Sequence, residues 1–273
     1  MVSRQPVAVS SARGATAPRD LPVDRLTLVY LGVVTAALLV AAAVDGWTAT
    51  RGRELGIHGG AIVALLVLRR LPMPRQPLLL FFRRAYPFLA LAWFYAQTAV
   101  LSQAIHPGYH DASVLQWDRW LFGSHPNAWL RERLPWPLLS ELLHACYYGY
   151  IAMTPTLALT LYLSRSERAF AVVTTTVMST FYFCYLWFVL YPVKGPWYVF
   201  VRPEGGGYGI FPTLVHRMLE GGAAVGAAFP SSHVAASLVI AALSRRFARR
   251  LSWLFVPMAA GILFATVYGG FHY

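Results

Sequence analysis

Long apolar stretches separated by short polar connections are the dominant pattern along this chain. A helix of roughly 20 apolar residues crosses a bilayer, and seven stretches reach or approach that length. They are Leu26–Val44, Gly56–Leu68, Ala85–Ile105, Leu138–Leu163, Ala169–Tyr191, Ser232–Leu243 (extended to Phe247) and Leu251–Phe271. The second is short and fits a half-span or a tilted segment. The pattern therefore predicts an all-α, polytopic integral membrane bundle of six to seven spans.

The connections predict additional local features. Residues 1–25 are rich in Ser, Ala, Arg and Pro and are expected to be a disordered tail, which leaves 26–273 as a single membrane-embedded domain. The Trp-rich connection 106–137 is expected to hold one or two short interfacial helices, with Asp118 and Asn127 as candidate caps. The glycine-rich residues 203–228 predict a mobile loop that can close over a site.

Composition and charge place this bundle in a membrane and orient it. Hydrophobic residues make up 57% of the chain and charged residues only 12%, whereas soluble domains carry about 25% charged residues. The net charge of +12 lies in the N-terminal tail and in the connections 69–84, 164–168 and 245–250. The positive-inside rule makes these segments cytoplasmic. The charge thus indicates a multi-pass cell-membrane protein with a cytoplasmic N-terminus, and gives no reason to expect nucleic acid as a partner.

Residues suited to phosphate chemistry collect at the opposite, extracytoplasmic face. His233 begins one predicted span and His272 ends the next, so antiparallel helices bring both histidines to the same side. Cations and a helix N-terminus bind phosphate oxygens, a neutral imidazole can attack phosphorus, and a second histidine can protonate the leaving group. No metal or cofactor is required. The candidate residues are Lys194, Arg202, Ser231, Ser232, His233 and His272.

Several of these residues also have a purely structural interpretation. Lys194 and Arg202 could extend toward lipid phosphates, and Ser231 could serve only as a helix N-cap. The segment 106–111 contains two histidines and an aspartate, but the sequence places no further metal ligand beside it. A Glu-x-x-His pair at Glu141 occurs once, whereas di-iron bundles use that pattern twice. We therefore predict no metal site.

Residues 194–272 resemble the type-2 phosphatidic acid phosphatase superfamily, which has a six-helix membrane core. Its three motifs are a Lys…Arg-Pro segment, a Pro-Ser-x-His segment and a late His followed by Asp. Here they read Lys194…Arg202-Pro203, Pro230-Ser231-Ser232-His233 and Tyr268-Gly269-Gly270-Phe271-His272. The resemblance implies that His272 is the nucleophile, that His233 is the acid, and that Lys194, Arg202, Ser231 and Ser232 bind phosphate.

Further residues resemble one branch of this superfamily, the inositol phosphorylceramide synthases and their bacterial relatives. They are Asp118-Arg119-Trp120-Leu121-Phe122-Gly123, Pro126, Trp129-Leu130, Pro192, Pro196-Trp197 and Thr266-Val267-Tyr268. This makes Trp197, Thr266 and Tyr268 candidate supporting residues. The branch implies inositol-type phosphotransfer from a lipid phosphate substrate to a polyol acceptor, within membrane lipids. A lipid phosphate phosphatase is the alternative enzyme, and a non-catalytic transporter or scaffold is the alternative outside enzymes.

The sequence departs from the superfamily pattern in three places. Seven residues separate Lys194 from Arg202 where six are usual, and Thr266 stands where an arginine is usual. The Asp expected four positions after His272 would lie beyond Tyr273. We therefore expect the given chain to be truncated at its C-terminus, and we expect a chain without that orienting carboxylate to have low activity.

Overall fold

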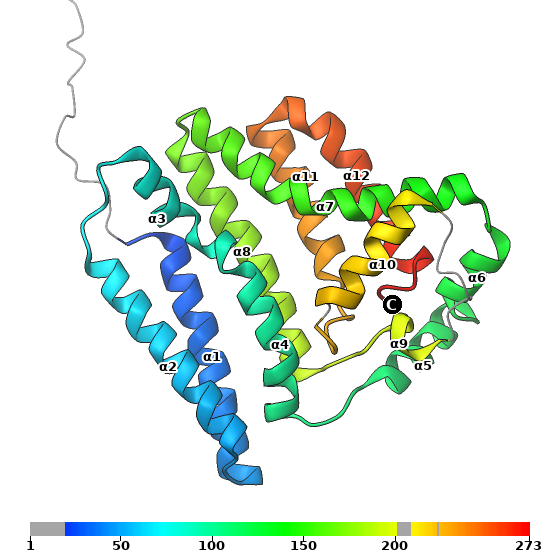
Figure 1. Ribbon diagram of the computed structural model, residues 1–273, viewed down its shortest axis with the longest axis horizontal. Coiled ribbons are helices and arrows are strands. Elements are labelled where there is room, and N and C mark those ends of the chain that lie inside the picture. The colour runs from blue at the N-terminus through cyan, green and yellow to red at the C-terminus, as the bar shows by residue number, and fades with distance from the viewer. Residues whose placement is uncertain (1–19, 201–208, 223) are drawn as a thin grey trace, which may run out of the picture.

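The computed structural model describes residues 20–200, 209–222 and 224–273, which fold as a bundle of helices (Figure 1). The helices are α1 (Pro22–Asp45), α2 (Ala49–Arg70), α3 (Pro77–Leu89), α4 (Leu91–Ile105), α5 (Asp111–Phe122), α6 (Pro126–Arg133), α7 (Pro137–Leu163), α8 (Glu167–Leu190), α9 (Pro196–Val199), α10 (Ile210–Gly222), α11 (Ser232–Phe247) and α12 (Arg249–Tyr268). Proline lies in the first turn of α1, α3, α6, α7 and α9, where its fixed φ suits a helix and its missing N–H costs nothing. Within the described ranges β-pairing is limited to one bridge, so the all-α prediction is confirmed.

Four helical stretches in the described part of the chain are long and apolar enough to cross a membrane. They are α1, the continuous stretch Pro77–Ile105 formed by α3 and α4, α8 and α12. The other predicted spans also lie in helices, but α11 has only 16 residues and α2 carries Arg51 and Glu54 near its start. The molecule thus has the helices of a multi-pass membrane protein, while six to seven spans remain a prediction.

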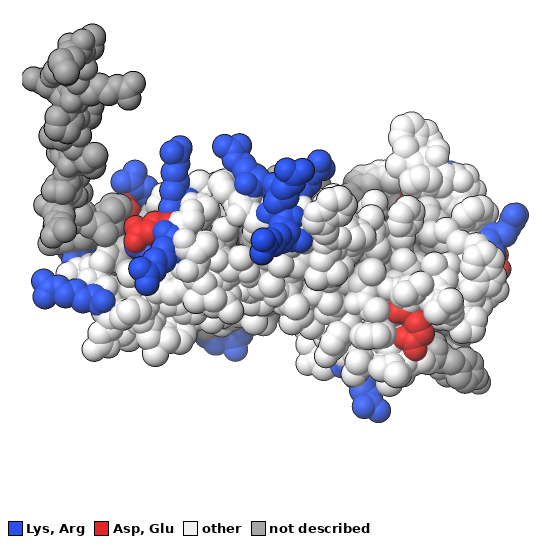
Figure 2. Space-filling view, turned by 90° about the horizontal axis from the view of Figure 1, so that it is seen from above, with Lys and Arg blue, Asp and Glu red and all other residues white. Residues whose placement is uncertain are grey.

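The connections with excess positive charge lie at one end of the bundle. The start of α3, the turn from α7 to α8 and the turn from α11 to α12 are at the top of Figure 1. Figure 2 looks onto this end and shows Lys and Arg side chains in several groups on a largely uncharged surface. The opposite ends of α8, α11 and α12 converge near the chain's last residues.

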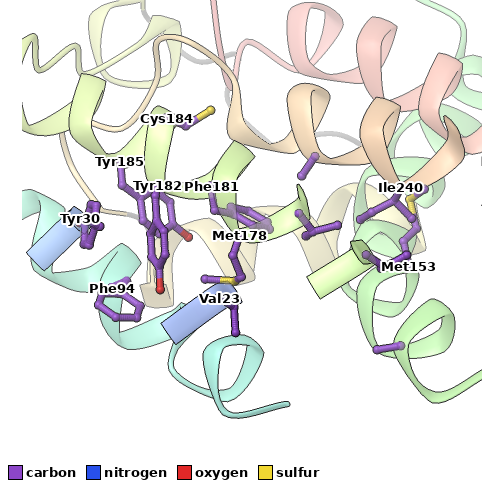
Figure 3. Close-up of a cluster of buried hydrophobic side chains, with 14 of the residues drawn as sticks. Val23, Tyr30, Phe94, Met153, Met178, Phe181, Tyr182, Cys184, Tyr185 and Ile240 are labelled. Carbon is purple, nitrogen blue, oxygen red and sulfur yellow. The ribbon is translucent and has the colours of Figure 1, made fainter. Parts of the chain in front are cut away.

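Helix α8 forms the centre of the bundle. Its buried side chains pack against α1, α4, α7 and α11 (Figure 3). Tyr182 of α8 stacks on Tyr30 of α1 at 4.4 Å between ring centroids, and Phe94 of α4 meets both rings edge-on. Such aromatic pairs add roughly 0.5–1.5 kcal/mol to the free energy of area burial. They hold α1 and α4 against α8, and the segment that follows α8 carries Lys194.

Two local predictions need correction. The connection 106–137 does form two short helices, α5 and α6, but Asp118 and Asn127 lie inside them and do not cap them. Residues 203–228 are not all loop, because α10 occupies Ile210–Gly222.

The N-terminus of α10 is capped by a side chain of another helix. The carboxylate of Glu141 on α7 accepts the backbone N–H groups of Ile210 and Phe211. A carboxylate at a helix N-terminus is favoured by the unpaired amides and the helix dipole.

Candidate active site

Two segments far apart in sequence pair alongside the predicted motifs. The N–H of Val193 donates to the carbonyl of Gly226 at 3.0 Å, and the N–H of Ala228 donates to the carbonyl of Val193 at 3.0 Å. This parallel pairing places the segment before Lys194 beside the segment that leads into Pro230. The first two motifs are therefore joined through the backbone.

The second motif opens α11. Ser231 is the N-cap, and its hydroxyl accepts the N–H of Val234 at 3.3 Å. Ser232 is the first helical residue and is buried, and His233 follows in the same turn. The structural interpretation of Ser231 as a cap is thus correct. The hydroxyl remains beside the helix N-terminus, where amides favour anions.

The third motif is a tight turn after α12. The carbonyl of Thr266 accepts the N–H groups of Phe271 and His272 at 2.9 and 3.2 Å. The Tyr268 hydroxyl donates to the carbonyl of Leu134 at 2.9 Å, and Arg131 of α6 donates to the carbonyl of Gly269 at 3.1 Å. Thr266 and Tyr268 therefore shape the turn that presents His272 and do not line the cleft themselves.

The two histidines face each other. Nε2 of His272 lies 3.3 Å from Nδ1 of His233, and Nδ1 of His272 lies 2.9 Å from the carbonyl of Ala228. A carbonyl only accepts, so Nδ1 of His272 carries its proton and Nε2 has the free lone pair. Nδ1–H of His233 then donates to that lone pair. A backbone carbonyl thereby orients His272, a task that the superfamily resemblance assigns to a later Asp.

Burial keeps His272 in the neutral form. The side chain is only 5% exposed, and desolvation lowers the pKa of its imidazole to about 4, although the bond to the Ala228 carbonyl acts in the opposite direction. At neutral pH its Nε2 is therefore an unprotonated nitrogen. This is the state in which a histidine can act as a nucleophile.

Lys194 is held at the cleft by a carboxylate that sequence reasoning did not select. Asp111, the first residue of α5, accepts the backbone N–H groups of Lys194 and Gly195 at 2.9 and 2.8 Å. The same carboxylate accepts the hydroxyl of Tyr273 at 3.1 Å. The Lys194 ammonium lies 4.5 Å from the centroid of the Tyr109 ring, a cation–π contact.

Gly195 is required by this arrangement. Its φ is +94°, and a Cβ there would lie 2.5 Å from the Cβ of Ala228 and 3.3 Å from the carbonyl oxygen of Phe271. Any side chain would separate the first motif from the other two. The residue after Lys194 must therefore be glycine for both conformational and packing reasons.

These groups line one cleft, whose cavity volume is about 30 Å³. The predicted residues that line it are Lys194, Trp197, His233 and His272. The remaining wall is largely aromatic and apolar and consists of Tyr95, Tyr147, Tyr198, Leu219, Ala224, Ala227, Ala228 and Phe271. Ser231, Ser232, Thr266 and Tyr268 do not line the cleft, and Arg202 lies outside the described residues.

Tyr147 is the second residue whose position the sequence did not reveal. It is 1% exposed, its ring stacks on His233 at 4.8 Å, and its hydroxyl lies 3.5 Å from Nε2 of His233. It lies in an apolar stretch of α7. No spacing links Tyr147 or Asp111 to the motifs, and only the packing of α5 and α7 brings them to the cleft.

The side chains of the segment 106–111 take part in ring stacking and in a hydrogen bond to the backbone. The rings of His106, His110 and Tyr191 stack on one another, and Asp111 faces the backbone of Lys194. Within the described ranges no three His, Cys, Asp or Glu residues group as metal ligands would.

Comparison with known proteins identifies the family of the chain. The family model of the PAP2 superfamily matches residues 112–273, which include both histidines and Lys194. Neither a curated protein nor a solved structure matches the chain. The matched region covers more than half of the sequence and contains α6 to α12, and the chain therefore belongs to the PAP2 superfamily.

Proposed function

We propose that this protein transfers a phosphoryl or phosphoalcohol group from a lipid phosphate through a phosphohistidine at His272, and that the acceptor is a polyol of the inositol type. Membership of the superfamily supports phosphatase or phosphotransferase activity in general. The observation that carries the specific proposal is the contact of 3.3 Å between Nε2 of His272 and Nδ1 of His233, in a cleft that Lys194 also lines.

Each group has a defined task in this reaction. Nε2 of His272 attacks phosphorus, the N–P bond forms, and the P–O bond to the leaving alcohol breaks while His233 protonates the departing oxygen. The acceptor hydroxyl then attacks phosphorus and returns its proton to His233, and the N–P bond breaks. Lys194 neutralises the non-bridging oxygens throughout, with Arg202 as a second cation and Ser231 and Ser232 at the helix N-terminus.

Substrate must separate the two imidazoles before the reaction begins. A phosphorus atom with its leaving oxygen cannot fit in a gap of 3.3 Å, so binding replaces the histidine–histidine hydrogen bond. His233 acts as an acid only as imidazolium. The negative charge of the phosphate favours that protonated form, and the Tyr147 hydroxyl beside Nε2 can accept its second N–H.

The aromatic wall of the cleft supports a polyol acceptor. Trp197, Tyr147 and Tyr198 offer flat apolar faces together with phenol and indole groups that form hydrogen bonds. A ring polyol has C–H faces and hydroxyl edges that match such a wall. The residues of the inositol phosphorylceramide synthase-like branch, including Trp197 and Thr266, support the same choice.

The proposal includes a membrane placement. The domain spanning residues 26–273 crosses the cell membrane six to seven times, with the N-terminus and the basic connections in the cytoplasm and the cleft at the extracytoplasmic face. The alternation of basic and neutral connections supports this orientation. Lipid phosphate then reaches the cleft from the surrounding membrane.

The test uses the purified protein in liposomes with ³²P-labelled lipid phosphate, with and without inositol. We expect an acid-labile protein adduct and labelled inositol phosphate. His272→Ala should abolish the adduct, and His233→Ala should lower turnover at least 100-fold, in line with loss of a general acid. His106→Ala, at a histidine outside the cleft, is the matched control.

Three results would change the proposal. Inorganic phosphate as the only product, whether or not inositol is present, would assign water as the acceptor and make the protein a lipid phosphate phosphatase. Full turnover in well-folded His233→Ala and His272→Ala would remove the enzyme assignment and favour a transporter or scaffold. If His233→Ala kept full turnover while His272→Ala lost it, another residue would have to be the general acid.

A further inference from the structure

A second cavity lies at the other end of α8 from the candidate active site. It has a volume of about 280 Å³ and is bordered by α1, α3 and α8. Its wall is mainly apolar and includes Leu21, Pro22, Val23, Met73, Phe170 and Ala171. The cleft with the two histidines lies beyond Leu190, at the opposite end of this helix, so the cavity is a separate feature.

Two hydroxyl groups in this cavity have no partner. Thr174 and Thr175 line it, Thr174 is 2% exposed, and neither Oγ1 atom has a hydrogen-bond partner among the described residues. Most buried polar groups are paired, and an unpaired one costs about 1–3 kcal/mol. Two unpaired hydroxyls on successive residues indicate that the cavity receives a molecule with hydrogen-bond acceptors.

The mouth of the cavity is positively charged. Arg84 and Arg168 line it together with Glu167. Arg84 pairs with Glu167 at 2.9 Å and its side chain is only 12% exposed, while Arg168 is exposed and has no carboxylate partner in the described part of the chain. Both arginines belong to the basic connections 69–84 and 164–168, at the end of the bundle shown in Figure 2. Guanidinium groups form charge-assisted hydrogen bonds with phosphate.

The charges and the hydroxyls occur in a definite order along α8. Arg168 and Thr174 are six residues apart, which corresponds to about 9 Å along the helix axis at 1.5 Å per residue. In a glycerophospholipid, the phosphate is likewise followed by ester carbonyls and then by acyl chains. A free phosphate at the arginines would leave the threonine hydroxyls and the apolar wall unoccupied.

We infer that this cavity binds an anionic glycerophospholipid. The arginines hold its phosphate, the hydroxyls of Thr174 and Thr175 donate to its ester carbonyls, and the apolar wall contacts the acyl chains. Basic residues at a membrane boundary attract anionic headgroups. The lipid would fill the space between α1, α3 and α8 and thereby stabilise the bundle, independently of the chemistry in the histidine cleft.

Binding can be measured on the full chain in detergent by native mass spectrometry and thermal stability. The probes are dioleoyl phosphatidylglycerol, dioleoyl phosphatidylcholine and glycerol 3-phosphate. We expect one phosphatidylglycerol molecule to be retained and to raise the melting temperature. Phosphatidylcholine should bind at least fivefold more weakly because its headgroup has no net charge, and glycerol 3-phosphate should have no effect.

Matched variants locate the lipid. Thr174→Val removes a hydroxyl at nearly constant shape, and Thr176→Val makes the same change at an exposed position on the same helix. Arg168→Gln is paired with Arg165→Gln, in the same connection but outside the cavity. We expect at least tenfold weaker phosphatidylglycerol binding for Thr174→Val and Arg168→Gln, and less than a twofold change for the two controls.

Several outcomes would overturn this inference. One is equal affinity of Arg168→Gln and the original protein for phosphatidylglycerol. Arg168 is exposed, so its substitution does not disturb the packing of the core. An equal loss in each matched control would show a general charge or helix effect. Loss of binding in Lys194→Gln instead would place the lipid in the histidine cleft. If phosphatidylcholine bound as tightly as phosphatidylglycerol, the cavity would contact acyl chains without selecting an anionic headgroup.

Discussion

At the scale of single residues, Asp111 connects the first and last motifs. Its carboxylate accepts two backbone N–H groups beside Lys194 and the hydroxyl of Tyr273. These are three bonds to one charged acceptor, and hydrogen bonds to charged groups are stronger than neutral ones. The distance between the ammonium of Lys194 and the imidazole of His272 therefore depends on this side chain.

We expect Asp111→Ala to lower kcat/KM at least tenfold and to lower the free energy of unfolding by about 1–3 kcal/mol, because buried donors lose their acceptor. Asp111→Asn retains one acceptor oxygen and should be affected less. Asp118→Asn is the matched control, since Asp118 lies on the same helix and is directed toward His125, 3.9 Å away. Equal loss of activity in the control would contradict a specific role for Asp111.

A second residue-scale prediction concerns pH. Burial lowers the pKa of His272 to about 4, whereas an imidazole in the unfolded chain titrates near 6.5. Between these values the unfolded state binds a proton that the folded state does not, so the free energy of unfolding must fall as pH decreases from about 6.5 to about 4. His272→Asn should reduce this dependence, as measured by unfolding in detergent across that range. An unchanged pH profile in the variant would exclude His272 as its source.

At the scale of elements, helix ends hold most of the site. His233 is in the first turn of α11, His272 follows the end of α12, and Asp111 begins α5. Helix ends expose the backbone groups that a site can use. They also leave the chain free to turn, as in the segment from Gly269 to His272 that the carbonyl of Thr266 closes.

Helix α10 covers the cleft from one side. In this helix, which is yellow in Figure 1, Val215, Met218 and Leu219 pack with Tyr147 and Phe271. The carboxylate of Glu141 on α7 caps its first turn. The glycine content of residues 203–228 favoured a loop in the sequence. The helix forms because its apolar side chains find a partner surface on α7, which is a tertiary effect.

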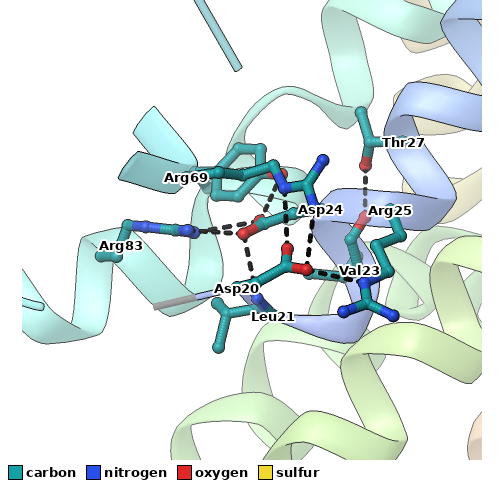
Figure 4. Close-up of polar contacts among 9 residues, drawn as sticks. Asp20, Leu21, Val23, Asp24, Arg25, Thr27, Arg69 and Arg83 are labelled. Carbon is teal, nitrogen blue, oxygen red and sulfur yellow. Dashed lines mark hydrogen bonds and ion pairs between the residues drawn. The ribbon is translucent and has the colours of Figure 1, made fainter. Parts of the chain in front are cut away.

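At the scale of the whole molecule, a buried ion pair fixes the N-terminal helices. Asp24 of α1 is fully buried, and its carboxylate accepts two bonds from Arg83 of α3, with the Tyr86 hydroxyl at 2.9 Å (Figure 4). Beside it, Asp20 accepts two bonds from Arg69 of α2. Charges in the low-dielectric interior are tolerated only when they are paired and hydrogen-bonded.

We expect Asp24→Ala to lower the free energy of unfolding by about 3–5 kcal/mol, because it leaves a buried guanidinium without its carboxylate. The exposed pair between Arg25 and Asp20 provides the comparison: Arg25→Gln should change stability by about 1 kcal/mol or less. Unfolding in detergent measures both. If the two variants were equally stable, the buried pair would not hold the helices.

The sequence alone determined the features that depend on local pattern. Apolar length predicted the helices α1, α4, α7, α8, α11 and α12, because residues facing lipid or a helical core must be apolar over many consecutive turns. Antiparallel connection of two helices predicted that His233 and His272 lie on one side. The Pro-Ser-Ser-His motif predicted a capped helix start, and Ser231 forms that cap.

Only the tertiary structure decided what depends on packing between distant segments. It brought Asp111, 83 residues before Lys194, to the backbone of the first motif, and Tyr147, 86 residues before His233, onto the imidazole. It assigned the carbonyl of Ala228 to orient His272, since a backbone acceptor carries no sequence signature. Local patterns fix which segments are helical, whereas the contacts that build a site form only when the helices pack.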